Sequence, residues 1–266
     1  DLNRATYPND TVVKGKTLKP QDLDYNFHTN VTDGHGYPCG HRPDVRFSNK
    51  YEGQCTDSKI KGNDKQKKSG ACAPFRRLFL CDQNLEYIKS EKITSTDNLL
   101  LEVSLAAKYE GQMIAKKLQE YDPTNYKSRI CTELARSFAD IGDIVRGKDL
   151  FLGTNEEKKP LEENLKKLFK RLYTDLNDPK KSSYNDDGTG NYYKLREHWW
   201  NSNRNDVWNA ITCSAPEEAK YKIIERDGNI KESAVGQCRC ITGDPPTNLD
   251  YVPQFFRWFE EWAEDL

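Results

Sequence analysis

A basic segment between residues 59 and 77 holds the side chains best suited to binding a ligand. It has seven lysines and arginines against one acidic residue, Asp64, a local charge of +6 in a chain whose formal net charge is -1. Ammonium groups attract polyanions and release counterions on binding, and arginine adds a planar fork that matches sulfate or carboxylate. Together with two preceding arginines, the candidate polyanion- or glycan-binding residues are Lys59, Lys61, Lys65, Lys67, Lys68, Arg76, Arg77, Arg42 and Arg46.

A second interpretation of these charges stays open. Lysine-rich loops often do no more than keep a protein in solution, and residues 59–68 fit that description. A solvated helix face is the favoured interpretation of another basic stripe, because Glu162 and Glu163 precede it by one turn and are placed to pair with it. That stripe consists of Lys166, Lys167, Lys170 and Arg171.

The eight cysteines favour an oxidising compartment and a disulfide-linked structure. They are Cys39, Cys55, Cys72, Cys81, Cys131, Cys213, Cys238 and Cys240. A zinc site is the alternative, with His35, Cys39, His41 and the Cys238/Cys240 pair as ligands, but paired Cys-x2-Cys knuckles are missing and no metal is expected. Spacing does not choose among the possible pairings. Sequons begin at Asn9 and Asn30, which is consistent with secretion.

Motifs for catalysis are absent from the sequence. It has no glycine-rich phosphate loop, no His-Glu-x-x-His and no Gly-x-Ser-x-Gly, so neither an enzyme nor a cofactor is expected. His198 lies beside two tryptophans, where a packing role is favoured over that of a general base. The acidic pairs at 260–261 and 264–265 are interpreted as the solvated face of a helix. An oxidising compartment and the lack of a nucleic-acid-binding motif argue against nucleic acid as the polyanion.

Apolar residues recur at helical spacing over much of the chain and predict an all-α protein. The predicted helices cover about 97–121, 129–146, 160–176, 192–212 and 249–266, with Asp97 as an N-cap and Gly147 just past a C-terminus. Aromatic residues at the same spacing predict the core: Trp199, Trp200, Trp208, Phe255, Phe259 and Trp262. The last helix is still amphipathic where the sequence stops, which favours a fragment of a longer chain.

Several long strings resemble one known family. They are ACAPFRRL at 71–78 with Cys81-Asp82, ICTELARSFADIGDIVRGKDL at 130–150, REHWW at 196–200, VWNAITC at 207–213 and DYVPQFFRWFEEWAED at 250–265. In this order they closely resemble a Duffy-binding-like domain of the alpha class from the variant erythrocyte membrane protein 1 of the malaria parasite Plasmodium falciparum. One departure is Gln21, where that family often has a cysteine.

The resemblance implies the Duffy-binding-like fold. We expect an N-terminal segment arm at 1–38, a loop-rich, Cys-linked subdomain 1 at 39–95 and a helical-bundle subdomain 2 at 96–266, with subdomain 3 absent. It also implies an adhesion module, exported to the surface of the infected erythrocyte as the extracellular part of a membrane protein. The implied partners are heparin or heparan sulfate-like glycans, blood-group carbohydrate or complement receptor 1 on host cells, in rosetting or cytoadherence, and antibodies against an antigenically varying surface. An alternative role is a scaffold that positions and shields neighbouring domains of the same chain and has no ligand of its own.

Overall fold

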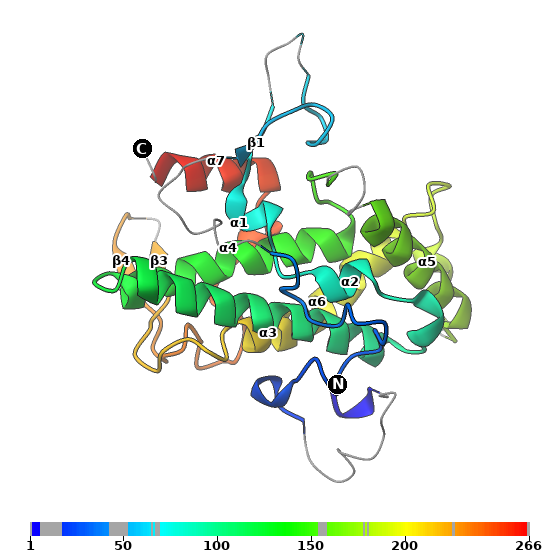
Figure 1. The fold of residues 1–266 in the computed structure, drawn as a ribbon, viewed down its shortest axis with the longest axis horizontal. Coiled ribbons are helices and arrows are strands. Elements are labelled where there is room, and N and C mark those ends of the chain that lie inside the picture. The colour runs from blue at the N-terminus through cyan, green and yellow to red at the C-terminus, as the bar shows by residue number, and fades with distance from the viewer. Residues whose placement is uncertain are drawn as a thin grey trace.

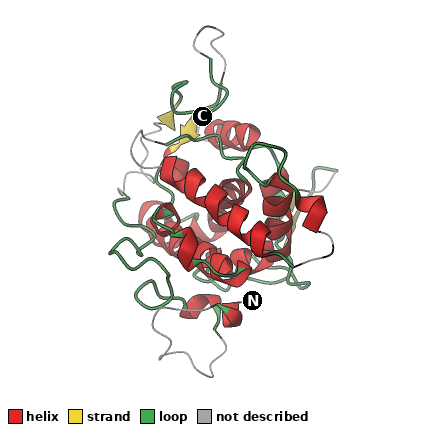
Figure 2. Ribbon diagram, turned by 90° about the vertical axis from the view of Figure 1, so that its right-hand side faces the viewer, coloured by secondary structure: helices red, strands yellow, loops and turns green. Residues whose placement is uncertain are grey.

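Three long helices form the centre of the molecule. The computed structural model describes residues 2–5, 18–42, 53–64, 66, 70–153, 159–177, 179, 181–224 and 227–264. In it, α3 (Thr96–Tyr121), α4 (Tyr126–Arg146) and α6 (Tyr193–Ile211) pack against one another, as Figure 1 shows. This confirms the helices predicted at 97–121, 129–146 and 192–212. Viewed along the bundle, the helices group together and most loops lie at the periphery (Figure 2).

Buried aromatic rings fill the space between these helices. Phe138 of α4 lies 5.1 Å, centroid to centroid, from both Trp200 and Trp208 of α6, and all three side chains are buried. Such tilted and edge-to-face contacts stabilise a core beyond the burial of apolar area. The core role predicted for the tryptophans of this helix is therefore confirmed, including that of Trp199.

Two glycines allow the three helices to approach closely. A Cβ atom on Gly111 of α3 would lie 1.9 Å from the carbonyl oxygen of Ile211, which is closer than any real contact. A Cβ on Gly142 of α4 would lie 2.8 Å from the ring of Trp200. Because glycine has no side chain, the backbone of α3 can touch the end of α6, and α4 can lie flat on the tryptophan.

The ends of these helices follow known capping rules. Ser95, and not Asp97, caps α3, because the Ser95 hydroxyl accepts a hydrogen bond from the backbone N–H of Asn98 at 3.2 Å. The predicted cap was two residues too late. Gly147 ends α4 with a φ of 73°, a left-handed conformation that glycine adopts without a steric penalty. The prediction for Gly147 is confirmed.

Shorter helical elements flank the bundle. The helix predicted at 160–176 is α5 (Lys159–Asp175), which buries Leu165, Leu168 and Phe169. Two short α-helices, α1 (Phe75–Leu78) and α2 (Gln83–Glu86), precede the bundle in the chain. Single 3-10 turns are η1 (Leu2–Arg4), η2 (Pro20–Asp22), η4 (Ser90–Lys92), η5 (Lys181–Tyr184) and η6 (Leu249–Tyr251).

Residues 18–42, which contain the described end of the arm predicted at 1–38, are fastened to α3. The buried carboxylate of Glu102 accepts hydrogen bonds from the Thr29 hydroxyl and, at 2.5 Å, from the backbone N–H of Asn30. Further along α3, the ammonium group of Lys108 donates to the carbonyls of Gln21 and Leu23. Burial raises the pKa of Glu102, and its hydrogen bonds from the arm and from Asn84 oppose that rise. The arm is thus part of the packed structure.

The described residues also form two small antiparallel sheets of two strands each. In the first, β1 (Gly53–Gln54) pairs with β2 (Ala73–Pro74), and Gly53 lies opposite Pro74. In the second, β3 (Lys222–Ile224) pairs with β4 (Ile230–Glu232), and Ile223 lies opposite Lys231. No helix in the described part of the chain is both long enough and apolar enough to cross a bilayer.

Three disulfides connect distant segments. They join Cys39 to Cys81, Cys55 to Cys72 and Cys131 to Cys238. The prediction of a disulfide-linked structure is confirmed for these six cysteines, and the remaining two, Cys213 and Cys240, are free thiols. Cys213 follows α6 and lies half-buried beside the Ser214 hydroxyl, and burial raises the pKa of its thiol. The zinc alternative loses two ligands, because Cys39 and Cys238 are both bridged.

The last helix contradicts the sequence prediction most clearly. It is α7 (Gln254–Glu264), and it is oriented with a mixed polar and apolar face inward. The buried residues are Gln254, Arg257, Trp258 and Glu261. The core prediction is wrong for Phe255 and Phe259, which are 42% and 68% exposed, and the adjacent Phe256 is 59% exposed. Trp262 is partly buried and packs against the small apolar cluster that contains Trp258, as predicted. Ion pairs on the inner face determine this orientation.

Candidate ligand-binding surface

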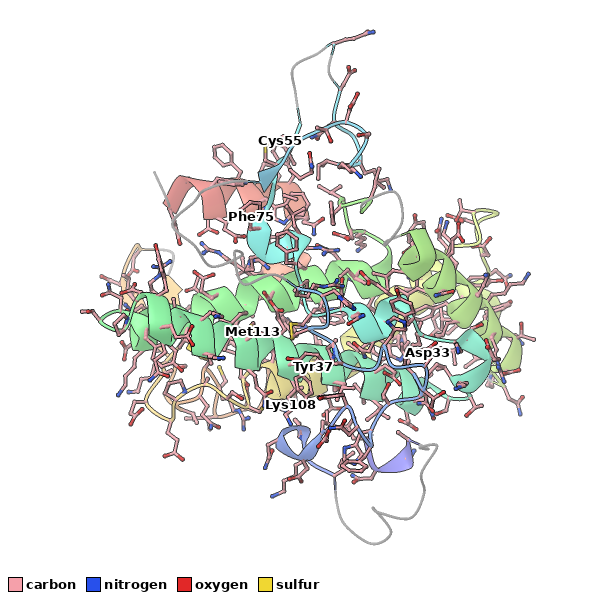
Figure 3. The ribbon with its side chains drawn as sticks, viewed as in Figure 1. Asp33, Tyr37, Cys55, Phe75, Lys108 and Met113 are labelled. Carbon is pink, nitrogen blue, oxygen red and sulfur yellow. A yellow bond between two sulfur atoms is a disulfide. The ribbon has the colours of Figure 1, made fainter. Side chains whose placement is uncertain are left out.

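The described part of the basic segment forms the base of a loop that projects from the body of the molecule. In Figure 1 this loop rises beyond α7, and Figure 3 places Cys55 at its foot. The Cys55–Cys72 disulfide closes the loop. Inside it, the Asn63 side-chain amide donates to the carbonyls of Cys55 and Ala71 at 2.9 and 2.7 Å, and its oxygen accepts from the N–H of Ala71 at 2.8 Å. These contacts hold the two sides of the loop together.

Lys59 and Lys61 occupy a rigid position beside this loop. The residue between them, Ile60, is fully buried and forms an antiparallel β-bridge with Phe151. Lys61 N–H donates to the Leu150 carbonyl and Leu152 N–H to the Lys59 carbonyl, both at 2.8 Å. These hydrogen bonds fix the backbone at both lysines. Lys61 is exposed and Lys59 half-buried, so the structure leaves both accessible to a ligand.

Three arginines proposed as ligand-binding residues are not accessible. Arg76 is 4% exposed and Arg77 fully buried. Arg77 pairs with Asp149, and Arg42 pairs with Asp82 and Glu86 at 2.8 and 2.9 Å. Arginines whose donors are taken up by buried carboxylates cannot present them to a polyanion, so the prediction is wrong for Arg42, Arg76 and Arg77. Lys65, Lys67, Lys68 and Arg46 lie outside the described residues.

The buried arginines belong to an ionic network that joins α1, α4 and α7. Asp140 of α4 forms ion pairs with Arg76 and Arg257, each at 2.7 Å. Asp143 forms ion pairs with Arg257 at 2.6 Å and with Arg146 at 2.9 Å. Burial opposes ionisation of Asp140, but the two guanidinium groups outweigh it and hold its pKa well below the usual range. At Asp143 burial has the larger effect and raises the pKa to about 6. The network is structural, since none of its members is free to bind a ligand.

Glu261 of α7 also belongs to this network and corrects another prediction. It was expected on a solvated face, but it is buried and accepts from Arg76 at 2.8 Å. Its neighbours Glu260 and Glu264 are half-exposed and pair with Arg136 at 3.1 and 2.7 Å. Arg76 of α1 and Arg136 of α4 thus pair with acidic residues of α7, and Arg257 of α7 pairs with Asp140 and Asp143 of α4. These ion pairs, and not the burial of the phenylalanine side chains, therefore determine which face of α7 points inward.

A groove of about 510 Å³ lies beside the Ile60–Phe151 bridge, and we call it the α5–α6 groove. It brings together Lys61 of the basic segment and Lys166 of the α5 stripe, two regions that no sequence pattern connects. The exposed ring of Tyr193, at the start of α6, lies on the same groove. Its complete lining is Lys61, Ile144, Gly147, Asp149, Phe151, Leu152, Leu161, Glu162, Glu163, Lys166, Asn191 and Tyr193. No sequence signal marked Tyr193, because only folding places it in the same groove as Lys61.

A second groove, of about 400 Å³, separates α7 from the disulfide-closed loop. Phe255, Phe259 and Trp262 of α7 line one part, and Gly53, Cys55, Gly70, Ala71 and Cys72 line the other, with Trp258 buried between them. The Trp262 indole N–H donates to the Cys72 carbonyl at 2.8 Å, which ties the helix to the loop. This groove is largely apolar, unlike the α5–α6 groove.

The structure also shows whether one of the two sequons, at Asn30, is accessible for glycosylation. Asn30 is 6% exposed, and its backbone is held by Glu102, so this asparagine is not accessible to a glycosyltransferase in the folded domain. Asn9 lies outside the described residues. Within the described ranges, no three His, Cys, Asp or Glu side chains gather as a metal site.

Comparison with known proteins assigns the family. The family model for the Duffy binding domain matches residues 70–257, which include α1 to α6, strands β2 to β4 and the start of α7. The chain belongs to the Duffy binding domain family. Members of this family are receptor-binding adhesion domains, and its relatives include Duffy receptors of Plasmodium and domains of PfEMP1. The resemblance inferred from the sequence and the all-α Duffy-binding-like fold are both confirmed.

Solved structures of the same family show the fold in detail. The N-terminal NTS-DBL1-alpha and CIDR-gamma double domain of PfEMP1 from the P. falciparum varO strain is 44% identical, with a TM-score of 0.85, over 94% of this chain and 36% of that one. The varO NTS-DBL1(alpha-1) domain is 41% identical, with a TM-score of 0.79, over 95% and 57%. A more distant DBLb domain of PfEMP1, solved bound to human ICAM-1, is 27% identical, with a TM-score of 0.74, over 100% and 55%.

Curated relatives are more distant in sequence and much longer. The Duffy receptor gamma form of Plasmodium knowlesi is 22% identical over all of this chain, and the Duffy receptor of Plasmodium vivax (strain Salvador I) is 25% identical over 74% of it. This Duffy binding domain spans 23% and 16% of those two proteins. The shared region is thus one part of much longer proteins.

Proposed function

We propose that this domain is a cell-adhesion module, displayed outside the infected erythrocyte on an exported membrane protein, that binds sulfated glycans of host cells through the disulfide-closed basic loop. The observation that supports this most is the base of that loop. Lys61 is exposed and Lys59 half-buried on a segment fixed by the Ile60–Phe151 bridge. Asn63 and the Cys55–Cys72 disulfide connect the two ends of the segment whose sequence contains Lys65, Lys67 and Lys68. The fixed backbone at Lys59 and Lys61 reduces the conformational entropy that these two residues lose on binding.

Because the three arginines are buried, the proposal depends on lysine side chains for the contact with a ligand. With Arg42, Arg76 and Arg77 inside the protein, the accessible charge of the site comes mainly from lysines. Lysine ammonium groups act as point charges and not as bidentate forks. Attraction to a glycan should therefore depend strongly on salt and weakly on the exact position of each sulfate. Heparan sulfate-like chains fit this chemistry better than neutral blood-group carbohydrate or a protein receptor such as complement receptor 1.

Heparin affinity at two salt concentrations tests the proposal. We expect the combined variant Lys65→Gln, Lys67→Gln and Lys68→Gln to weaken heparin binding about tenfold or more in 0.1 M NaCl and to flatten its salt dependence. The matched control replaces three exposed lysines of the β3–β4 region, Lys220, Lys222 and Lys231, with glutamine. Equal effects of the two triple variants, or binding that ignores salt, would refute the role of the loop.

A scaffold role is the second candidate, and the outer face of α7 favours it. Three neighbouring exposed phenylalanines are unusual on the surface of a monomer and are typical of a packing surface. In this case the domain positions and shields neighbouring domains of the same chain and has no ligand of its own. The scaffold would be supported over the adhesin if the domain bound red cells and heparin only when joined to its neighbouring domain, and not when isolated.

A further inference from the structure

The α5–α6 groove has features that a loop of lysines lacks. Lys61 from the bridge, Lys166 from α5 and Tyr193 from α6 line the same cavity, although they are far apart in the sequence. Tyr193 is 38% exposed and Leu152 46% exposed, so the mouth of the groove offers an aromatic ring and an aliphatic side chain to solvent. Phe151 and Leu161 are buried behind them. Concave sites that combine apolar walls with a few placed polar groups are typical of small-ligand binding.

The carboxylates of the groove do not cancel its positive charge. Glu162 accepts two hydrogen bonds from Arg196, at 2.8 and 3.0 Å, and Asp149 pairs with Arg77. Both arginines are fully buried, so a guanidinium group inside the protein compensates the negative charge of each of these two acids. Glu163 is exposed and makes no ion pair with any described residue. The groove lining therefore has two positively charged lysines and one carboxylate whose charge is not compensated, so its net charge is positive.

These features together fit one class of ligand. A pyranose ring has an apolar C–H face that packs on an aromatic ring, and a sulfate or carboxylate on that ring is attracted by ammonium groups. We infer that the α5–α6 groove binds a single anionic sugar unit of the glycan, with its ring on Tyr193 and its acidic group on Lys61 and Lys166. This inference rests on the proposed glycan-binding function. It adds a ring-specific contact to the salt-dependent attraction of the basic loop.

Four single-residue variants distinguish ligand binding in the α5–α6 groove from ligand binding by the basic loop. Tyr193→Ala removes the ring contact, Lys166→Gln removes one charge and Glu163→Gln removes the opposing charge. Lys167→Gln is the matched control, because Lys167 is the next residue of α5, is exposed and does not line the groove. All four positions are at least partly exposed, so we expect the thermal unfolding midpoint to stay within about 2 °C of that of the unmodified domain.

The probes are a heparin hexasaccharide, a hyaluronan hexasaccharide and inorganic polyphosphate, which has no sugar ring. We expect Tyr193→Ala to weaken heparin hexasaccharide binding about fivefold at both 0.1 and 0.3 M NaCl, with an unchanged salt slope and unchanged polyphosphate affinity. Lys166→Gln should weaken both anionic ligands and reduce the salt slope. Glu163→Gln should tighten both, and Lys167→Gln should change neither beyond twofold. Hyaluronan binding that depends on Tyr193 would identify carboxylate as sufficient, and its absence would identify sulfate as the required group.

The outcomes distinguish this inference from the function on which it rests. If the Lys65/Lys67/Lys68 variant loses heparin while the Tyr193, Lys166 and Glu163 variants bind it like the unmodified domain, the groove is not the site and the loop proposal stands. If Tyr193→Ala weakens polyphosphate as much as the hexasaccharide, the sugar-ring contact is refuted. If the unmodified domain binds neither heparin nor polyphosphate, both the proposed function and this inference are wrong.

Discussion

Arg76 of α1 and Glu261 of α7 lie 185 residues apart in the sequence and form a two-point ion pair in the core. Arg76 Nε and Nη2 donate to the two carboxylate oxygens of Glu261 at 2.9 and 2.8 Å. The same guanidinium donates to the Ser137 hydroxyl at 3.1 Å and pairs with Asp140. This pair links the basic segment to the last helix, and it explains why the phenylalanines of that helix point outward.

Replacing Arg76 should destabilise the domain strongly. In Arg76→Met, Glu261 and Asp140 lose a partner that they share, and uncompensated buried carboxylates cost about 3–5 kcal/mol of folding free energy. Urea unfolding followed by tryptophan fluorescence measures this loss. Lys61→Gln is the control, because an exposed lysine should change stability by less than about 0.5 kcal/mol. A loss below about 1 kcal/mol for Arg76→Met would show that the network contributes little to stability.

The two aspartates of α4 should give the stability of the domain a maximum in mildly acidic solution. Because burial raises the pKa of Asp143 to about 6, above its unfolded value of 3.8, its contribution to stability increases as the pH falls from about 6 toward 4. Asp140 has the opposite shift, so its contribution is present above pH 3.8 and is lost as the pH falls below that value.

Urea midpoints between pH 3 and pH 7 test this dependence. In the unmodified domain the urea midpoint should increase as the pH falls from 6 to 4. We expect Asp143→Asn to lose the part of this increase that Asp143 contributes. The comparison also cancels the contribution of His28, whose pKa is lowered by burial and which is unchanged in the variant. Parallel curves for the two proteins over this range would show that Asp143 stays ionised, held by Arg257 and Arg146.

The domain should contain two free thiols. Denatured without reductant, it should react with two equivalents of a thiol reagent per chain, because six of its eight cysteines are bridged. In the native state Cys213 should react more slowly than a free thiol in a peptide, since burial raises its pKa and the thiolate is the reactive form. Peptide mapping identifies the labelled residues. Label on Cys131 or Cys238, or no label at all, would contradict this pairing.

The phenylalanine face of α7 should control solubility more than stability. We expect Phe256→Ser with Phe259→Ser to lower the binding of an environment-sensitive dye and to reduce self-association, while unfolding free energy changes by less than about 1 kcal/mol. Trp258→Ser is the contrast, because loss of this buried ring should cost about 3–5 kcal/mol. Sedimentation and urea unfolding on the same samples give both quantities. A large loss of stability in the phenylalanine variant would show that these rings pack in the folded domain.

Much of the fold follows from local patterns in the sequence. The spacing of Leu134, Phe138 and Ile141, with Gly147 after the last turn, is sufficient to predict α4, because helical periodicity and a C-terminal glycine are local signals. The same holds for the paired tryptophans of α6. Motifs such as ICTELARSFADIGDIVRGKDL also identify the family without any coordinates. The sequence also shows where positive charge is concentrated.

Only the tertiary structure decides which of those charges a ligand can reach. Nothing local distinguishes Arg76 from Lys61, yet one is buried against Glu261 and the other is exposed beside Tyr193. Hydrophobic spacing predicted the buried face of α7 wrongly, since the free energy of satisfying three buried arginines outweighs that of burying phenylalanines on a helix with little apolar surface to pack against. Partners this distant in sequence meet only in the folded chain, and periodicity within one element carries no information about them.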